Sequence, residues 1–339
     1  MRILHVYKDY APVVGGIENH IRALAEAQAR RGHAVTVLVT ARGRRTELLD
    51  LNGVRVIKAG RLATVASTPL SPSLVRLLGG QRPEITHLQA PYPVGELAQG
   101  LAGAGRPYVV SIQADVTRLA QRLVMAAYGP FYRRLLAGAA RVLVSTPNFA
   151  RTSPYLRGLA PDQLALVPLG VDLTRFTPAE AAEPQPARPL TGLYVGQLRH
   201  YKGVDDLLRA WPQVAGAPRL LIAGHGPQRA AWERLTADLG LAGRVRFLGN
   251  VADEALPDLY RAADLFVLPS TSRAESFGLV LVEAMASGLP CVTTEIGTGT
   301  SFVVRAGETG LVVPPRDPAA LAQALSRLAG DAALRARYG

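Results

Sequence analysis

Short apolar runs rich in β-branched residues alternate with longer segments of helical period along the whole chain. This alternation restricts the possible folds most strongly, because it is typical of parallel βαβ units. In residues 18–32, for example, Ile21, Leu24 and Ala25 follow helical spacing, and Gly32 ends the run. The expected strands are residues 2–7, 34–39, 54–59, 84–88, 107–112, 141–145, 164–169, 192–196, 219–224, 244–249, 265–270, 290–294 and 310–315. The sequence therefore predicts an α/β protein with doubly wound parallel sheets.

A proline-rich stretch without an apolar pattern separates the two halves, with prolines at 178, 184, 186 and 189. Proline and the residue before it resist both helix and central strand. We therefore expect an N-terminal Rossmann-like domain at residues 1–175, a linker at 176–190 and a C-terminal Rossmann-like domain at 191–339. Ligands of open α/β sheets bind at the carboxyl ends of the strands, so functional residues are expected in the turns after strands, facing a shared central cleft.

The net charge of +12 lies entirely in the first half of the chain. Residues 1–175 contain 22 basic and 10 acidic side chains, whereas the remainder contains 16 of each. Such asymmetry indicates an anionic partner, which could be nucleic acid, an acidic membrane surface or a phosphorylated substrate. A general preference for arginine, which supplies 35 of the 38 basic residues, would give the same bias. No nucleic-acid-binding motif is present, so a basic nucleic-acid-binding protein is the less favoured alternative.

Several protein classes are excluded by composition. The single cysteine, Cys291, cannot form an internal disulfide, and no apolar run approaches the ~20 residues of a membrane span. Charges at Arg2, Lys8 and Asp9 leave no apolar core for a signal peptide. The histidines show no metal-ligand spacing. We therefore expect a soluble cytoplasmic protein without a metal site.

Two glycine-containing turns follow strands and precede helices. Gly15 and Gly16 follow the first strand, and Gly196 follows the first strand of the second half, with Arg199 and Lys202 just before the next helix. Cations beside a helix N-terminus are unfavourable unless an anion is bound, so this second turn suits a diphosphate. The structural alternative is a simple tight turn at Gly15 and Gly16, and a solvated loop around Arg199 and Lys202.

The segment 265–294 contains the strongest signal. A strand leads into a loop with Glu275, a helix opens at Phe277-Gly278-Leu279, and Glu283 follows on a mostly apolar helix. The helix start offers unpaired N–H groups to an anion. An unpaired carboxylate at Glu283 would be costly. Two arrangements would compensate for this burial. The carboxylate could accept hydrogen bonds from the adjacent hydroxyls of a ribose, or it could pair with an arginine within the fold.

The segment ESFGLVLVEAMASGLP closely resembles the E-x7-E signature of the retaining GT-B glycosyltransferases of family four. Further segments resemble the family in the same order: VVGGIENHIRALAEAQARRGHAVTVL, VPLGVDLTRFTP, VGQLRHYKGVDDLLRAW, IAGHGP and EIGTGTSFVVRAGETGLVVPPRDP. The resemblance implies transfer of a sugar from a nucleotide-diphosphate donor to a hydroxyl acceptor, with retention of configuration and without a metal or other cofactor. It also implies that the C-terminal domain binds the donor and the N-terminal domain the acceptor.

The resemblance assigns roles to particular residues. Glu275 would contact hydroxyls of the donor sugar, Glu283 the ribose and Lys202 the diphosphate. The backbone of Phe277, Gly278 and Leu279 would meet the sugar and diphosphate, Gly15 and Gly16 would pack against the diphosphate, and Val251 would face the base.

The sequence departs from the family at three points. Gln197, directly after Gly196, stands where the family usually has arginine, and Arg199 could replace that arginine. Gln113 stands where many relatives have a histidine that contacts the donor sugar. The sequence also ends at DAALRARYG, before the terminal helices that cross back to the N-terminal domain in the family.

The sequence favours a donor like GDP-mannose, because EIGTGTSFVV is most similar to members that act on bacterial polysaccharide precursors. An epimerase or hydrolase acting on a nucleotide sugar with the same scaffold is the main alternative. Arginines 118, 122, 133, 134 and 141 lie among apolar and aromatic residues of one segment, and a second cluster, arginines 42, 44 and 45, follows the strand expected at 34–39. This suits peripheral binding to an anionic membrane, at the inner face, where a lipid-linked acceptor would be reached. Helix packing with solvated arginines is the structural alternative.

Overall fold

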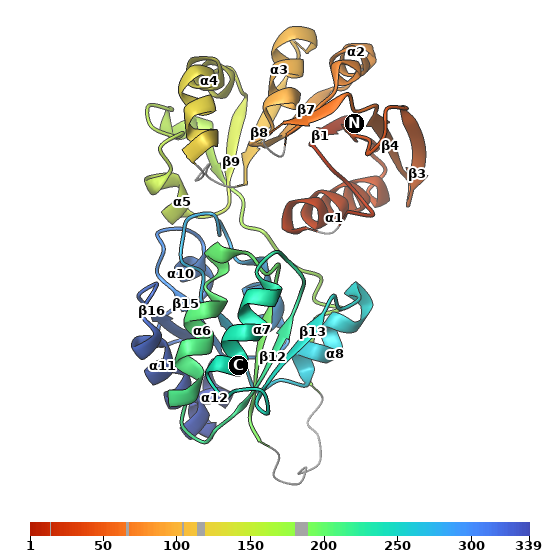
Figure 1. The fold of residues 1–339 in the computed structure, drawn as a ribbon. Coiled ribbons are helices and arrows are strands. Elements are labelled where there is room, and N and C mark those ends of the chain that lie inside the picture. The colour runs from red at the N-terminus through yellow and green to blue at the C-terminus, as the bar shows by residue number, and fades with distance from the viewer. Residues whose placement is uncertain (14, 66–67, 104, 114–118, 180–188) are drawn as a thin grey trace. The chain divides into compact units, whose positions relative to one another are not determined.

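The computed structural model describes residues 1–13, 15–65, 68–103, 105–113, 119–179 and 189–339. Contacts divide the chain into two compact units, Met1–Pro168 and Leu169–Gly339 (Figure 1). Each unit has its own apolar core and its own parallel sheet. The two units are described separately below.

The first unit is built on a sheet of strand order β10-β9-β8-β7-β1-β2-β4-β3. All its neighbouring strands are parallel except β3 and β4. Figure 1 shows α1 on one side of the strands and α2 and α3 on the other. The elements are β1 (Arg2–Val6), α1 (Gly16–Arg30), β2 (Ala34–Thr40), β3 (Glu47–Leu51), β4 (Val54–Ala59), β5 (Ala63–Val65), β6 (Thr68–Leu70), α2 (Pro72–Gly80), β7 (Ile85–Ala90), α3 (Pro93–Ala102), β8 (Tyr108–Ile112), α4 (Leu119–Ala137), β9 (Arg141–Val144), α5 (Pro147–Thr152), η1 (Pro161–Gln163) and β10 (Leu164–Leu166).

The second unit has a fully parallel sheet of order β13-β12-β11-β14-β15-β16. Strands β14 and β15 are buried along their whole length, which is why they read as continuous apolar runs in the sequence. The elements are β11 (Thr191–Val195), η2 (His200–Lys202), α6 (Val204–Ala210), η3 (Trp211–Gln213), β12 (Arg219–Ala223), α7 (Arg229–Asp238), β13 (Val245–Gly249), η4 (Asp253–Ala255), α8 (Leu256–Arg261), β14 (Leu265–Leu268), α9 (Leu279–Ala286), β15 (Cys291–Thr294), α10 (Thr300–Val303), β16 (Gly310–Val313), α11 (Pro318–Gly330) and α12 (Ala332–Tyr338).

These sheets confirm the predicted doubly wound α/β class. Every predicted strand is present, although the strand expected at 164–169 ends at Leu166. In both sheets the chain first adds strands to one side of its first strand and then to the other. The direction reverses between β1 and β7 in the first sheet and between β11 and β14 in the second. Such switch points are where open α/β sheets bind ligands.

The prediction missed three short strands of the first unit, β3, β5 and β6. Strand β3 pairs antiparallel with β4 through the two-residue turn Asn52–Gly53, and Leu51 lies opposite Val54. Both turn residues have positive φ, 53° and 78°. An Asn-Gly dipeptide between two apolar runs is the usual signal for such a hairpin, so the sequence contained the information.

The segment after the first unit packs into the second core. Phe176, expected at the start of the linker, is 5% exposed. Its ring lies edge-on to Tyr260, with 5.8 Å between the ring centroids. The expected linker residues 180–188 lie outside the described residues.

We predict that Phe176→Ala lowers the stability of the second unit by about 3–5 kcal/mol, the usual cost of emptying a buried aromatic site. Leu173→Ala, three residues earlier at a side chain that is 68% exposed, should change it by less than about 0.5 kcal/mol. Urea denaturation of both variants measures the difference. Equal effects would contradict the assignment of Phe176 to this core.

Candidate functional site

The loops that follow β11 and β14 meet at the switch point of the second sheet, because these strands are neighbours. The backbone N–H of Thr271 donates to the carbonyl of Tyr201 at 2.8 Å and joins the two loops. Gly203 makes the approach possible. It has φ of +67°, and a Cβ there would lie 2.1 Å from the carbonyl oxygen of Pro269. A glycine is therefore required at this position.

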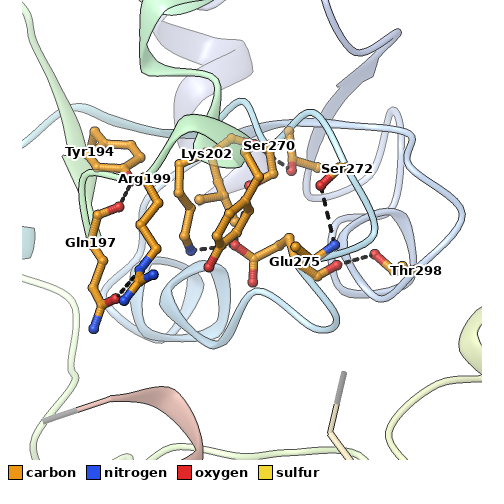
Figure 2. Close-up of polar contacts among 12 residues, drawn as sticks. Tyr194, Gln197, Arg199, Lys202, Ser270, Ser272, Glu275 and Thr298 are labelled. Atoms are coloured by element: carbon orange, nitrogen blue, oxygen red, sulfur yellow. Dashed lines mark hydrogen bonds and ion pairs between the residues drawn. The ribbon is translucent and has the colours of Figure 1, made fainter. Parts of the chain in front are cut away.

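A buried ion pair connects the side chains of the two loops (Figure 2). The Nζ of Lys202 lies 2.5 Å from Oε2 of Glu275, and the side chains are only 11% and 12% exposed. Burial lowers the pKa of Lys202, but the carboxylate of Glu275, with Tyr194 and Tyr201, raises that pKa above its usual value. Lys202 is therefore charged at neutral pH. The structure brings together two residues that are 73 positions apart in the sequence.

Neighbouring polar groups hold Glu275 in place, as Figure 2 shows. The hydroxyl of Ser270 donates to Oε2 of Glu275 at 3.2 Å. The backbone of Glu275 accepts from the hydroxyl of Thr298 at 2.7 Å and donates to the carbonyl of Ser272 at 3.1 Å. Ser270 and Lys202 thus hold the carboxylate of Glu275, while Thr298 and Ser272 hold its backbone. Such order suits a group that must meet a ligand precisely.

The other predicted residues of the first loop lie beside the ion pair and not in it. Gln197 and Arg199 are exposed, and Nε of Arg199 donates to Oε1 of Gln197 at 2.7 Å. The hydroxyl of Tyr194 donates to the carbonyl of Gln197 at 3.2 Å and holds the turn after Gly196. Arg199 therefore places a cation close to the position that the family gives to an arginine.

Glu283 lies on α9, and its carboxylate is held by a tyrosine. The hydroxyl of Tyr260 donates to Oε2 of Glu283 at 2.7 Å. Burial raises the pKa of Glu283 to about 7, although the hydrogen bond from Tyr260 lowers it. The nearby Arg175 is paired with Asp253 at 3.2 Å instead. The internal partner of Glu283 is thus a phenol. Within the part of the chain that the structure describes, no donor is found for Oε1 of Glu283.

The backbone before α9 has the geometry expected of an anion-binding turn. Gly278 caps the helix with φ of +80°, and α9 begins at Leu279. Phe277 and Gly278 precede α9 and Leu279 is its first residue, so no carbonyl of α9 can accept from their N–H groups. Val251, expected to face the base, follows β13 and is half-buried against the second core.

In the first unit, the predicted residues again follow central strands. Gly15 precedes α1, which begins at Gly16. A Cβ at Gly15 would lie 2.3 Å from Oε2 of Glu18, whereas one at Gly16 would meet nothing within 4 Å. Gln113 follows β8, is 7% exposed and donates from Nε2 to Oε1 of Gln89 at 2.7 Å.

Sequence reasoning missed four side chains of the two sites: Ser270, Tyr260, Glu18 and Gln89. Tyr260 and Gln89 contact residues 23 and 24 positions away, so no spacing rule reveals them. Ser270 and Glu18 lie within five residues of Glu275 and Gly15, but neither forms a recognisable motif with them. A polar residue in a central strand was a usable signal for Gln89, because such strands are usually apolar.

Comparison with known proteins identifies the family. The family described as Glycosyltransferase Family 4 matches residues 14–175, and the family described as Glycosyl transferases group 1 matches residues 189–331. The D-rhamnosyltransferase WbpZ of Pseudomonas aeruginosa is 34% identical over 96% of this chain and 86% of its own length. The chain belongs to glycosyltransferase family 4. The O-antigen chain mannosyltransferase C of Escherichia coli is 32% identical over the whole chain and 91% of its own length.

The fold of this glycosyltransferase is also found among solved structures. Sucrose-phosphate synthase of Thermosynechococcus elongatus superposes with a TM-score of 0.83 at 25% identity, over 99% of this chain and 92% of that one. This likeness confirms the GT-B fold predicted from the sequence. Among the described residues, no helix is long and apolar enough to cross a membrane. Nor do three His, Cys, Asp or Glu side chains of the described ranges gather as metal ligands.

We predict that Glu275→Leu lowers the free energy of unfolding by about 3–5 kcal/mol, because it leaves the buried charge of Lys202 without a partner. The double variant Lys202→Met/Glu275→Leu should recover most of this loss, since an apolar pair replaces the ion pair. Glu308→Leu, in the exposed pair of Arg305 and Glu308, serves as the control and should cost less than about 1 kcal/mol. If the double variant unfolds as easily as Glu275→Leu, the ion pair between Lys202 and Glu275 is not the source of the loss.

Proposed function

We propose that this glycosyltransferase transfers a sugar of the mannose type from a nucleoside-diphosphate donor to a hydroxyl acceptor, with retention of configuration and without a metal. The observation that carries the proposal is the Lys202–Glu275 pair at the switch point of the second sheet. The names of the two relatives, a D-rhamnosyltransferase and a mannosyltransferase, support a donor of this type and an acceptor in polysaccharide synthesis.

The proposed roles follow from charge and geometry. Negative charge builds on the diphosphate as the glycosidic bond breaks, and a preorganised cation at that place lowers the barrier. Lys202 is such a cation, because Glu275 already fixes its ammonium group. The N–H groups at the start of α9, which the helix's own carbonyls cannot satisfy, would add donors to the same anion. Oε1 of Glu275 is then available to the sugar hydroxyls.

A panel of nucleotide sugars tests the proposal. Purified protein is incubated with GDP-mannose, UDP-glucose and related donors, and release of the nucleoside diphosphate is measured. The anomeric configuration of the sugar product is read by NMR. Slow release from GDP-mannose with retention supports the transferase. An epimerised sugar, or release from no donor, would contradict it.

We expect Lys202→Ala to lower kcat by roughly 10²–10³, the usual cost of removing one group that stabilises a developing charge. Arg327→Ala, which removes an exposed cation from α11, is the control and should leave kcat unchanged. Turnover of Lys202→Ala at the wild-type rate would exclude Lys202 from the diphosphate site.

The raised pKa of Glu283, about 7, predicts a pH-dependent affinity. Ribose hydroxyls donate to the ionised carboxylate, so binding favours the deprotonated form and weakens as pH falls below 7. Calorimetry with GDP should give about tenfold weaker binding at pH 6 than at pH 8. Glu283→Gln removes the titrating group and should bind GDP with the pH dependence of the nucleotide alone. An unaltered pH profile in Glu283→Gln would exclude the ribose contact.

We also propose that the first unit binds anionic membrane from the cytoplasmic side and so reaches a lipid-linked acceptor. Arginines 42, 44 and 45 after β2 are exposed, as are Leu48 and Leu62 nearby, at 63% and 62%. In α4, Arg133 and Arg134 are exposed, but Tyr132 is buried and belongs to the core. Arg118 and the side chain of Arg122 lie outside the described residues.

Liposome co-sedimentation tests this proposal. Binding should require anionic lipid and fade as salt rises to ~0.5 M, because the screening length then falls to a few ångströms. Replacing Arg42, Arg44 and Arg45 by glutamine should weaken binding, since each arginine near the surface contributes ~1 kcal/mol. The same replacement at the exposed Arg305 and Arg327 is the control. Binding to neutral vesicles alone, or none at low salt, would exclude this membrane role.

A further inference from the structure

A row of polar side chains occupies the central strands of the first sheet. His5 lies on β1, His87 and Gln89 on β7, Ser111 on β8, and Gln113 directly after β8. The strand register places His5 beside His87 and Gln89 beside Ser111. All five are buried. Because buried polar groups are costly unless they are hydrogen-bonded, such a row in a central parallel sheet calls for a functional reason.

The side chains form a directional relay of hydrogen bonds. Nε2 of Gln113 donates to Oε1 of Gln89 at 2.7 Å. Nε2 of Gln89 in turn lies 3.1 Å from Nε2 of His87, to which it donates. The same imidazole nitrogen lies 2.7 Å from the hydroxyl of Ser111. His87 therefore has its lone pair at Nε2 and its proton at Nδ1.

The imidazole of His87 stays neutral in this setting. Burial lowers its pKa well below the ordinary value, and the nearby His5 and His20 lower it further. The tautomer of His87 thus sets the direction of both amides. Turning either amide round would place two donors or two acceptors against each other, so both amides and the imidazole proton must change together.

This direction decides which atom Gln113 offers to a ligand. Its Nε2 already donates to Oε1 of the buried Gln89. Within the described ranges, the structure gives Oε1 of Gln113 no hydrogen-bond donor. Gln113 therefore presents an acceptor, whereas an imidazole can present either a donor or an acceptor, depending on its tautomer.

We propose that Gln89 is a positioning residue that holds Gln113 so that its carbonyl oxygen, and not its amide nitrogen, is offered to a sugar hydroxyl, from which it accepts a hydrogen bond. The proposal rests on the proposed function and on the resemblance by which Gln113 stands where many relatives have a histidine that contacts the sugar. A fixed acceptor discriminates against a donor in which hydrogen replaces the contacted hydroxyl. We therefore expect the enzyme to use sugars that carry the hydroxyl contacted by Gln113 and to discriminate against sugars that lack it.

Steady-state kinetics with GDP-mannose tests the role of Gln89. Gln89→Met removes the acceptor for Gln113 and should lower kcat/KM about threefold to tenfold, the effect of one hydrogen bond. Gln89→Glu keeps a carboxylate oxygen for Gln113, and its second oxygen can accept from Nε2 of His87 once the imidazole proton moves there from Nδ1. Gln113 then keeps its direction, so kcat/KM should stay within about twofold of wild type. The ratio of kcat/KM for GDP-mannose to kcat/KM for the monodeoxy analogue that lacks the contacted hydroxyl should fall in Gln89→Met by the same factor.

A double-mutant cycle separates positioning from a merely structural role. In the Gln113→Met background, Gln89→Met should cost no more than about twofold, because the group that it positions is already absent. Gln99→Met is a matched control, since Gln99 on α3 is equally buried and donates to the carbonyl of Gly103 at 3.0 Å. It should alter stability but not donor preference. Equal losses from Gln89→Met in both backgrounds would overturn the proposal.

The relay is also tested without turnover. In ¹⁵N NMR spectra of the wild-type protein, His87 should be neutral and protonated at Nδ1 between pH 6 and pH 8. Protonation at Nε2 would require both amides to be reversed and would overturn the proposal. If the wild-type protein releases GDP from GDP-mannose no faster than Lys202→Ala, the proposed donor is wrong. The ¹⁵N spectrum then still tests the relay, because it shows which nitrogen of His87 carries the proton.

Discussion

The organisation of the second unit depends on one buried ion pair. Lys202 and Glu275 come from loops after two neighbouring strands, and each charge would be costly without the other. The pair requires close approach of the two loops, which the absence of a side chain at Gly203 permits. Isolated buried pairs rarely add stability compared with apolar residues of the same size. Retention of charges here is best explained by a ligand that needs them.

The first unit carries its polar groups in a different way. Its polar row lies within the central strands, on side chains that bond to one another, from His87 through Gln89 to Gln113. Such a network is stable only when its members are satisfied, and it then fixes one arrangement of donors and acceptors. The second unit thus presents a fixed cation at its switch point, and the first unit presents a fixed acceptor.

Much of this architecture could be predicted because the relevant signals are local. Strands buried on both faces produce continuous apolar runs, and the mostly apolar segment that opens at Phe277-Gly278-Leu279 marked the helix after β14. The signal for the hairpin of β3 and β4 was also local, but the prediction overlooked its Asn52–Gly53 turn.

What could not be predicted was the identity of the partners. Lys202 was expected to meet only a diphosphate, and the structure pairs it with Glu275. Glu283 was expected to meet a ribose or an arginine, and Tyr260 occupies one of its oxygens. Both contacts join residues more than 20 positions apart in sequence. They depend on strand order, which no residue pattern in a single sequence specifies.

The central claim is that the second unit binds a nucleoside diphosphate at the switch point of its sheet. Thermal unfolding with and without GDP, UDP and duplex DNA tests it most directly, because a ligand that binds only the folded state raises Tm as its concentration rises above Kd. GDP or UDP should raise Tm in a concentration-dependent way, and DNA should not. A Tm that rises with DNA and stays constant with both nucleotides would contradict the account.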